Sequence, residues 1–120
     1  MVDWCQAKDI PIIPGVATPT EIITTLDKGF NVLKLFPADL LGGIRLIKAL
    51  SPVFENVRFI PTGGITPDNI REFLESEAVW ACGGSWLVAS QLISTGNFEE
   101  IQRLTYEAMR IVRQVREKDN

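Results

Sequence analysis

Four short runs of apolar residues recur along the chain, and each is followed by a turn and a helix-like pattern. The expected strands cover residues 10–16, 31–37, 57–61 and 78–82. They are almost entirely apolar, which is typical of parallel strands covered on both faces. Strands that alternate with helices indicate βαβ units and a parallel sheet. We therefore expect an α/β fold forming a single domain over residues 1–120.

The helical patterns carry start and stop signals. Thr18, Pro19 and Glu21 are expected to begin the first helix as N-cap, first helical residue and capping-box carboxylate, and Gly29 to end it. Thr66 is expected to begin another helix, which runs to about residue 76. Further helices are expected over residues 43–50, 85–93 and about 99–117. The last has an apolar stripe formed by Ile101, Leu104, Ala108, Ile111, Val112 and Val115.

The spacing of these units matches a (β/α)8 TIM barrel, which needs roughly 250 residues for eight units. The chain has 120 residues and about four units. Residues 2–8 look like the end of a helix from a preceding unit. We therefore expect the C-terminal half of such a barrel. The alternative is an open, flavodoxin-like sheet, and because its barrel-interior face would be uncovered, we expect an oligomer or a rearranged fold.

Composition excludes several classes of function. The net charge of -3 argues against a nucleic-acid partner, and the absence of histidine removes the commonest metal ligand. The two cysteines match no metal spacing and fit a reduced interior. No apolar run reaches the ~18 residues that span a bilayer, and the N-terminus lacks a signal-peptide pattern. We expect a cytoplasmic protein with no metal, cofactor or membrane association.

Lys34 is the one charged residue in the second apolar run. Side chains alternate along a strand, so Val32, Lys34 and Phe36 share a face, which in a barrel is the interior. Burial disfavours a charged ammonium, and a lysine that loses its proton can form a Schiff base with a carbonyl substrate. This pattern indicates carbonyl chemistry. The alternative is an edge-strand lysine, or one that reaches solvent.

Paired glycines follow the third and fourth runs, at Gly63-Gly64 and at Gly83-Gly84-Ser85. Glycine lets a backbone approach an anion closely, and barrel phosphate sites often form from the loops after strands seven and eight with a short extra helix. The repeated pair favours a phosphate site, although each pair also suits a tight turn.

Other polar and aromatic side chains have two interpretations each. Thr62 ends its strand, where its hydroxyl could bond a substrate oxygen or cap the turn. Asp39 is expected to be a solvated loop residue rather than an acid–base group. We expect Trp4, Trp80 and Trp86 to pack in the core rather than to serve as stacking platforms.

Four stretches together resemble a known family. They are PGVATPTE at residues 14–21, KLFPA at 34–38, RFIPTGGI at 58–65 and GGSWLV at 83–88. In sequence and spacing they look like the KDPG/KHG aldolases, the 2-keto-3-deoxy-6-phosphogluconate and 4-hydroxy-2-oxoglutarate aldolases. The similarity covers essentially the whole chain.

The resemblance implies class I aldolase chemistry on a (β/α)8 barrel, usually a trimer, without metal or cofactor. Lys34 occupies the place of the Schiff-base lysine, and Phe36 and Thr62 match positions that line the pyruvyl pocket. The implied substrate is a phosphorylated 2-keto acid, cleaved to pyruvate and glyceraldehyde 3-phosphate, or 4-hydroxy-2-oxoglutarate, cleaved to pyruvate and glyoxylate. The positions that match phosphate-binding residues are Gly63, Gly64, Gly84 and Ser85.

The chain departs from the family in one respect. The family's general-base glutamate, and the arginine and threonine that bind the substrate carboxylate, come from the first half of the barrel, which has no counterpart in this sequence. One hypothesis is therefore an impaired class I aldolase. The alternative is a noncatalytic phosphate-binding or self-assembling half-barrel module, in which copies pair to cover their open sheet edges.

Overall fold

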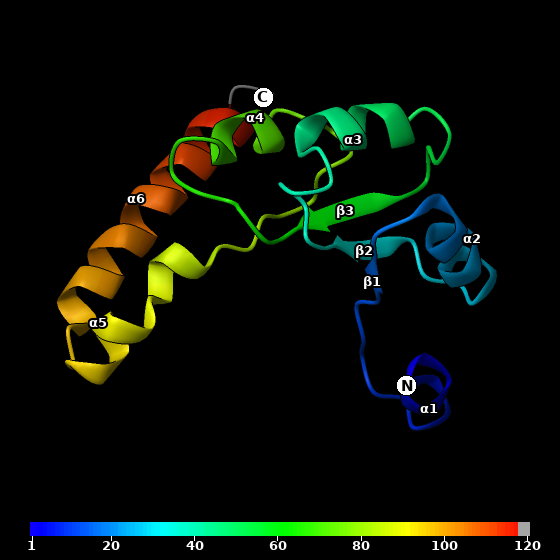
Figure 1. Ribbon diagram of the computed structural model, residues 1–120, viewed down its shortest axis with the longest axis horizontal. Helices are drawn as coiled ribbons and strands as arrows, with labels where there is room; N and C mark the ends of the chain where they lie inside the picture. Colours follow the sequence, from blue (N-terminus) through cyan, green and yellow to red (C-terminus); the bar gives the residue numbers. More distant parts are fainter. Residues whose placement is uncertain (118–120) are drawn as a thin grey trace.

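The computed structural model describes residues 1–117 and shows an α/β chain with a parallel three-stranded sheet (Figure 1). The strands are β1 (Gly15–Val16), β2 (Val32–Leu35) and β3 (Arg58–Pro61), in the order β1-β2-β3. The helices are α1 (Val2–Ala7), α2 (Pro19–Asp27), α3 (Ile44–Leu50), α4 (Ile70–Leu74), a 3-10 helix η1 (Ser85–Val88), α5 (Ser90–Ser94) and α6 (Phe98–Arg116).

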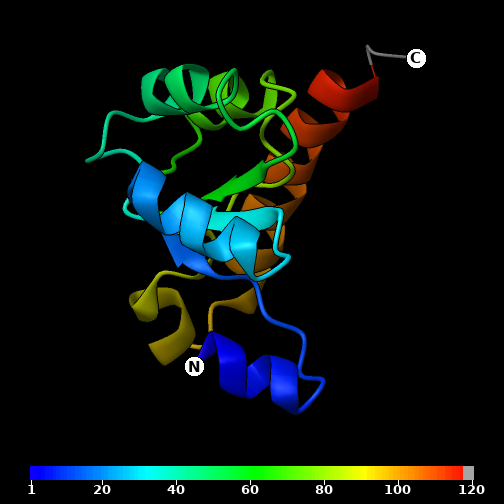
Figure 2. The same cartoon turned by 90° about the vertical axis from the view of Figure 1, so that its right-hand side faces the viewer.

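The sheet has one covered face and one open face. Leu33, Leu35 and Phe59 are fully buried on the covered face, where α2, α3 and α4 supply most of the remaining core. Figures 1 and 2 both show α3 and α4 gathered above the sheet, with α1 far away at the opposite end of the molecule. Lys34 lies on the open face, where it pairs in register with Gly15 on one side and Ile60 on the other.

The expected first strand is much shorter than predicted. Only Gly15 and Val16 of residues 10–16 pair with β2, and the stretch before them runs as an extended link to α1. Proline has no N–H to donate to a sheet, and Pro11 and Pro14 both lie in this stretch. The outer side of this edge also has no neighbouring strand in the described part of the chain.

The expected fourth strand, residues 78–82, does not form a regular strand. It contacts β3 through two isolated parallel bridges, Phe59 to Val79 and Thr62 to Gly83. The bridged residues are 20 apart in sequence in the first bridge and 21 apart in the second. The segment at residues 79–83 therefore contains one extra residue and bulges between the two bridges. A strand at a sheet edge has a ladder on one side only, which lets its ends deviate from regular pairing.

The capping box of α2 is confirmed. Thr18 accepts a hydrogen bond from the Glu21 amide, while the Glu21 carboxylate accepts from the amides of Ala17 and Thr18. These bonds hold the pKa of Glu21 below its usual range. Gly29 follows the last turn with a φ of 86°, as expected for a residue that ends a helix.

Two helix predictions are wrong in detail. Thr66 does not begin α4, because residues 67–69 form a turn and Asn69 occupies the N-cap position. The expected helix over residues 85–93 is divided at Ala89, whose extended ψ of 136° ends η1 before α5 begins. The helix at residues 43–50 matches the prediction within one residue.

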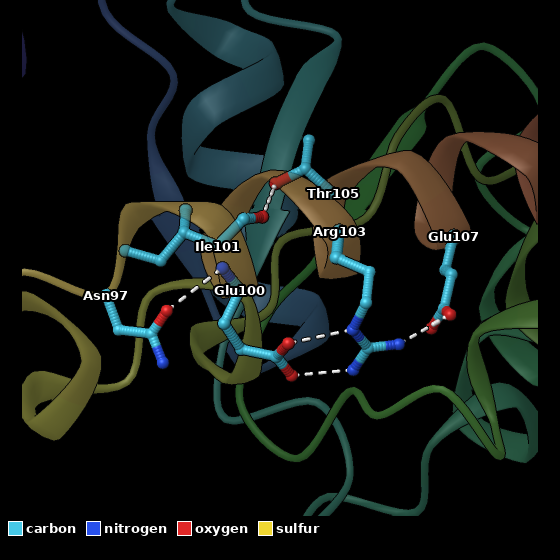
Figure 3. A network of polar contacts seen from close by, with 6 residues as sticks. All are labelled: Asn97, Glu100, Ile101, Arg103, Thr105 and Glu107. Atoms are coloured by element: carbon cyan, nitrogen blue, oxygen red, sulfur yellow. Dashed lines mark hydrogen bonds and ion pairs between the residues drawn. The ribbon is translucent and has the colours of Figure 1, made fainter.

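Helix α6 has a side-chain N-cap and a local ion-pair network near its start (Figure 3). Asn97 accepts from the Glu100 amide at its start, and Arg103 donates to the carboxylates of Glu100 and Glu107 at 2.6–2.8 Å. Its predicted apolar stripe is confirmed, since Ala108 and Val115 are buried and the other members are partly buried. No helix within residues 1–117 has the length and apolarity to cross a membrane.

Candidate active site

Lys34 and Phe36 point from β2 onto the open face of the sheet. The Lys34 Nζ lies 5.2 Å from the centre of the Phe36 ring, within the range of a cation–π contact. Both side chains are exposed, Phe36 to 52%. The expectation that Lys34 is held dry in an apolar interior is therefore wrong for this chain. The physical reason is that no element of residues 1–117 covers this face of the sheet.

The first diglycine loop needs glycine for two reasons. Gly63 and Gly64 have φ values of 85° and 82°, a region that strains any residue with a Cβ. A Cβ on Gly64 would also lie 2.2 Å from the Cβ of Asp39. The amides of Ala38 and Asp39 donate to the carbonyls of Thr62 and Gly63, so the loops after β2 and β3 are joined directly.

The second diglycine loop lies beside the first. Gly83 donates to the Pro61 carbonyl and bridges Thr62, and a Cβ on Gly83 would lie 2.7 Å from the Thr62 methyl group. The indole of Trp86 packs onto Gly84 so closely that a Cβ there would lie 1.5 Å from the ring. Trp86 is partly buried, as expected, whereas Trp4 and Trp80 are exposed, against expectation.

The Thr62 hydroxyl lies between the two loops without a hydrogen-bond partner. Its Oγ1 is buried, and it is the one buried side-chain nitrogen or oxygen among residues 1–117 for which no hydrogen-bond partner is found. Leaving a buried hydroxyl unpaired costs about 1–3 kcal/mol. An unpaired buried polar group calls for an explanation, such as a catalytic role or a bound water or ion.

A pocket of about 390 Å³ brings these features together. It is lined by all seven residues selected from the sequence, together with two that were not selected, Ile65 and Gly83. Gly83 stands inside the glycine run and could have been chosen with its neighbours. Ile65 carries no chemical signal in the sequence, and only the fold shows that it reaches the pocket.

The pocket contains one charged group. Lys34 is its only ionisable lining residue among residues 1–117, so no carboxylate lines the pocket beside the lysine. Asp39 is exposed and packs behind Gly64 rather than lining the pocket, which agrees with the prediction of a solvated loop residue. The described residues contain no group of three metal-ligating side chains.

The backbone of the two loops leaves several donors free. Within residues 1–117, no hydrogen bond is found from the amides of Gly63, Gly64 and Gly84. Unpaired backbone amides in successive loop residues are a feature of anion-binding concavities.

Comparison with known proteins identifies relatives of this chain. The family described as KDPG and KHG aldolase matches residues 1–104. A 2-dehydro-3-deoxy-phosphogluconate aldolase of Treponema pallidum is 44% identical over 93% of this chain and 53% of its own length. A KHG/KDPG aldolase of Escherichia coli K12 is 41% identical over 83% of this chain and 47% of its own length.

Two solved structures are also similar. A KDPG aldolase of Legionella pneumophila, solved with pyruvate captured at low pH as a covalent carbinolamine, has a TM-score of 0.77 and 45% identity over 79% of this chain. A 4-hydroxy-2-oxoglutarate/KDPG aldolase from TTHB1 has a TM-score of 0.80 and 37% identity over 90% of this chain. The chain covers 46% and 51% of these two structures, so it spans about half the length of its relatives. The match over residues 1–104, together with these identities, shows that the chain belongs to the KDPG and KHG aldolase family.

Proposed function

We propose that this chain carries the Schiff-base lysine and the phosphate loops of a class I aldolase, on the C-terminal half of a (β/α)8 barrel. Neutral Lys34 attacks the C2 carbonyl of a 2-keto acid to give a carbinolamine, and protonation of the carbinolamine hydroxyl followed by loss of water gives an iminium. When the C3–C4 bond breaks, its electron pair enters the iminium and an aldehyde leaves. Protonation at C3 and hydrolysis then release pyruvate and regenerate the amine.

The assembly of one pocket from three separate segments carries this proposal. Lys34 comes from β2, Thr62 ends β3 and Ser85 begins η1, yet all three line the same 390 Å³ space. The unpaired Thr62 hydroxyl supports a ligand oxygen at this place. The carbinolamine in the Legionella pneumophila relative supports pyruvate as the bound 2-keto acid.

The substrate that we favour carries a phosphate. The free amides of Gly63, Gly64 and Gly84 and the Ser85 hydroxyl would hold it, because glycine allows the close approach that a phosphate needs. This favours 2-keto-3-deoxy-6-phosphogluconate over the unphosphorylated 4-hydroxy-2-oxoglutarate. No metal or cofactor takes part, since the iminium is the electron sink.

Proton transfer is the step of the reaction for which the pocket lining within residues 1–117 supplies no carboxylate. Cleavage requires a base to accept the C4 hydroxyl proton, and no carboxylate lines the pocket among residues 1–117. General acid–base catalysis is worth about 10²–10⁴ in rate. We therefore expect imine formation by this chain with slow cleavage.

Borohydride trapping tests the proposal. The chain is incubated with pyruvate and sodium borohydride, and the modified residue is located by peptide mass spectrometry. We expect a reduced adduct on Lys34 that disappears in Lys34→Met. Lys48→Met is the matched control, because Lys48 is an exposed lysine on α3 away from the pocket. A wild-type chain without an adduct, or an adduct that survives Lys34→Met, would contradict the Schiff-base role.

A second candidate function is noncatalytic phosphate binding. The exposure of Lys34 and the absence of a lining carboxylate favour it, because both features lower the capacity for imine chemistry without affecting the loops. A phosphosugar that raises the melting temperature of a chain that gives no borohydride adduct would support this second function over the first.

A further inference from the structure

Asn69 stands at the start of helix α4, but its side chain does not cap that helix. An asparagine at an N-cap position usually accepts a hydrogen bond from an amide in the first turn, and α4 shows no such bond. The side chain turns back to the preceding loop instead. Its Nδ2 donates to the Gly64 carbonyl at 2.9 Å, and its Oδ1 accepts from the Thr66 amide at 2.8 Å. The polar atoms of Asn69 therefore hold the loop after β3 rather than the helix.

An amide side chain is the kind that this loop requires. The Gly64 carbonyl needs a donor and the Thr66 amide needs an acceptor, and one side-chain amide supplies both. An ionised aspartate would supply acceptors only, and a serine hydroxyl is one bond shorter. Asparagine therefore suits both contacts at once.

Three successive carbonyls in this loop each accept a hydrogen bond. Residues 38 and 39 donate their amides to the first two, the carbonyls of Thr62 and Gly63, at 2.8 and 3.0 Å. Asn69 donates to the third, the carbonyl of Gly64, at 2.9 Å. The three donor residues lie outside the lining of the 390 Å³ pocket, whereas the three acceptor residues line it. The loop is therefore held by groups that do not belong to the pocket.

A held carbonyl also sets the direction of the amide that follows it. The peptide bonds after Thr62, Gly63 and Gly64 are trans, and in a planar trans peptide the N–H points opposite to the C=O. The amides of Gly63, Gly64 and Ile65 therefore point away from the three donor groups. Within residues 1–117, no hydrogen bond from any of these three amides is found.

Ile65 adds an amide that the glycine pattern does not reveal. Its side chain packs in the core and the residue is only 4% exposed, yet it lines the pocket. The backbone is therefore the part of Ile65 that is available to a ligand in the pocket. Together with Gly63 and Gly64 it gives three unpaired amides in succession, as loops that bind anions commonly have.

From these contacts we propose that Asn69 is a positioning residue for phosphate binding. Its bond to the Gly64 carbonyl fixes the Gly64–Ile65 peptide, and the Ile65 amide then serves as a further donor to the phosphate. The proposal rests on the phosphate site of the proposed function, but not on imine formation at Lys34. Asn69 itself does not touch the phosphate, since it lies outside the pocket lining.

A phosphate titration followed by NMR tests the proposal. The 15N-labelled chain is titrated with inorganic phosphate at constant ionic strength, and the amide resonances of residues 63–65 and 84 are followed. We expect the Ile65 amide proton to move downfield and to saturate with the same Kd as the Gly63 and Gly64 amides. Asn69→Ala should raise this Kd about tenfold, as expected for the loss of one hydrogen bond to a charged group.

Asn97→Ala is the matched control variant. Asn97 also holds a backbone amide, that of Glu100, but it does so at the start of α6 and outside the pocket lining. Its loss should lower the stability of the chain and leave the phosphate Kd unchanged. If circular dichroism shows that Asn69→Ala is unfolded, Asn69→Ser replaces it, because serine retains an N-cap oxygen for α4 and is too short to reach the Gly64 carbonyl.

The yield of the pyruvate adduct separates positioning from a general loss of structure. Lys34 lies on β2, which is held by its own ladders to β1 and β3. The adduct yield should therefore be unchanged in Asn69→Ala while phosphate binding weakens. A variant that loses phosphate binding and the adduct by the same factor would overturn the positioning role.

Removal of a single N–H tests the Ile65 donor without a change of side chain. An α-hydroxy acid that carries the isoleucine side chain replaces Ile65, so that an ester replaces the amide. The same replacement at Thr20 is the control, because its amide is also unpaired within residues 1–117 but lies in the first turn of α2. Phosphate should bind about tenfold more weakly to the ester at position 65 and normally to the ester at position 20. Normal binding by the ester at position 65 would refute the Ile65 donor.

The wild-type titration distinguishes failure of this proposal from failure of the proposed function. If the wild-type chain binds phosphate and Asn69→Ala binds it equally well, the positioning role is refuted and the phosphate site stands. If the glycine amides of the wild-type chain do not respond, the phosphate site is refuted and the role of Asn69 with it. Phosphate binding requires no imine, so the titration is decisive even for a chain that gives no borohydride adduct.

Discussion

Gly64→Ala tests whether the diglycine loop depends on its close approach to Asp39. The substitution has two separable costs. A side chain at a φ of 82° costs about 1–2 kcal/mol. The new Cβ would also lie 2.2 Å from the Asp39 Cβ, and relieving such overpacking costs about 1–3 kcal/mol. We expect the free energy of unfolding to fall by about 2–5 kcal/mol in total.

Gly29→Ala is the matched control for this experiment. Gly29 has nearly the same φ, 86°, but a Cβ there would meet nothing within 4 Å. The backbone cost and the effect of glycine on the unfolded chain are therefore similar in the two variants. Urea denaturation should give a larger loss for Gly64→Ala than for Gly29→Ala by about 1–3 kcal/mol.

Substitutions at Asp39 identify the atom responsible. Asp39→Gly removes the Cβ that the methyl group introduced by Gly64→Ala would meet, whereas Asp39→Ala removes the carboxylate and keeps the Cβ. In a double-mutant cycle, Asp39→Gly should lower the extra cost of Gly64→Ala more than Asp39→Ala does, because Asp39→Ala relieves only the contacts with Cγ and Oδ2 at 3.0 and 3.1 Å. Equal losses for Gly64→Ala and Gly29→Ala, or equal relief by Asp39→Ala and Asp39→Gly, would refute the reasoning.

Two further predictions follow from the hydroxyl of Thr62 and the carboxylate of Glu21. Thr62→Val should leave the free energy of unfolding unchanged or raise it, because the buried hydroxyl has no hydrogen-bond partner to lose. The yield of the pyruvate adduct should fall in the same variant. A destabilised variant with a normal adduct yield would contradict this prediction. Hydrogen bonds from the Ala17 and Thr18 amides lower the pKa of Glu21, so its contribution to stability is present above pH 4.5 and is lost as the pH falls through its folded-state pKa. Glu21→Gln should therefore weaken the acid dependence of the melting temperature, and Glu72→Gln, which changes a carboxylate in the first turn of another helix, is the comparison variant.

Local signals in the sequence were sufficient for several elements. The capping box at Thr18 and Glu21 depends on residues three apart, and the apolar stripe of α6 depends on helical periodicity. Both signals act within one segment, so no knowledge of the rest of the fold is needed. The positions of the second and third strands could also be predicted from local sequence, because buried parallel strands have continuous apolar sequences.

The errors concern partners that are distant in sequence or missing from the chain. An apolar run such as residues 78–82 becomes a regular strand only where a ladder forms, and the sequence does not tell which edges are paired. The burial of Lys34 was overestimated for the same reason, since its neighbours in sequence are apolar but its side of the sheet is uncovered. The seven residues selected by resemblance to the family line one pocket, while Ile65 could only be found from the fold.

The local bonds at the start of α6 have a consequence for the order of folding. Its N-cap and its Glu100–Arg103–Glu107 network join residues within two turns of one another, so they require no long chain closure. The sheet, in contrast, must bring together residues that are 19 apart (Gly15 and Lys34) or 26 apart (Val32 and Arg58) before any ladder bond forms. A synthetic peptide of residues 97–116 should therefore retain measurable helix in cold water, and ribosomal synthesis would complete this helix only after the three strands.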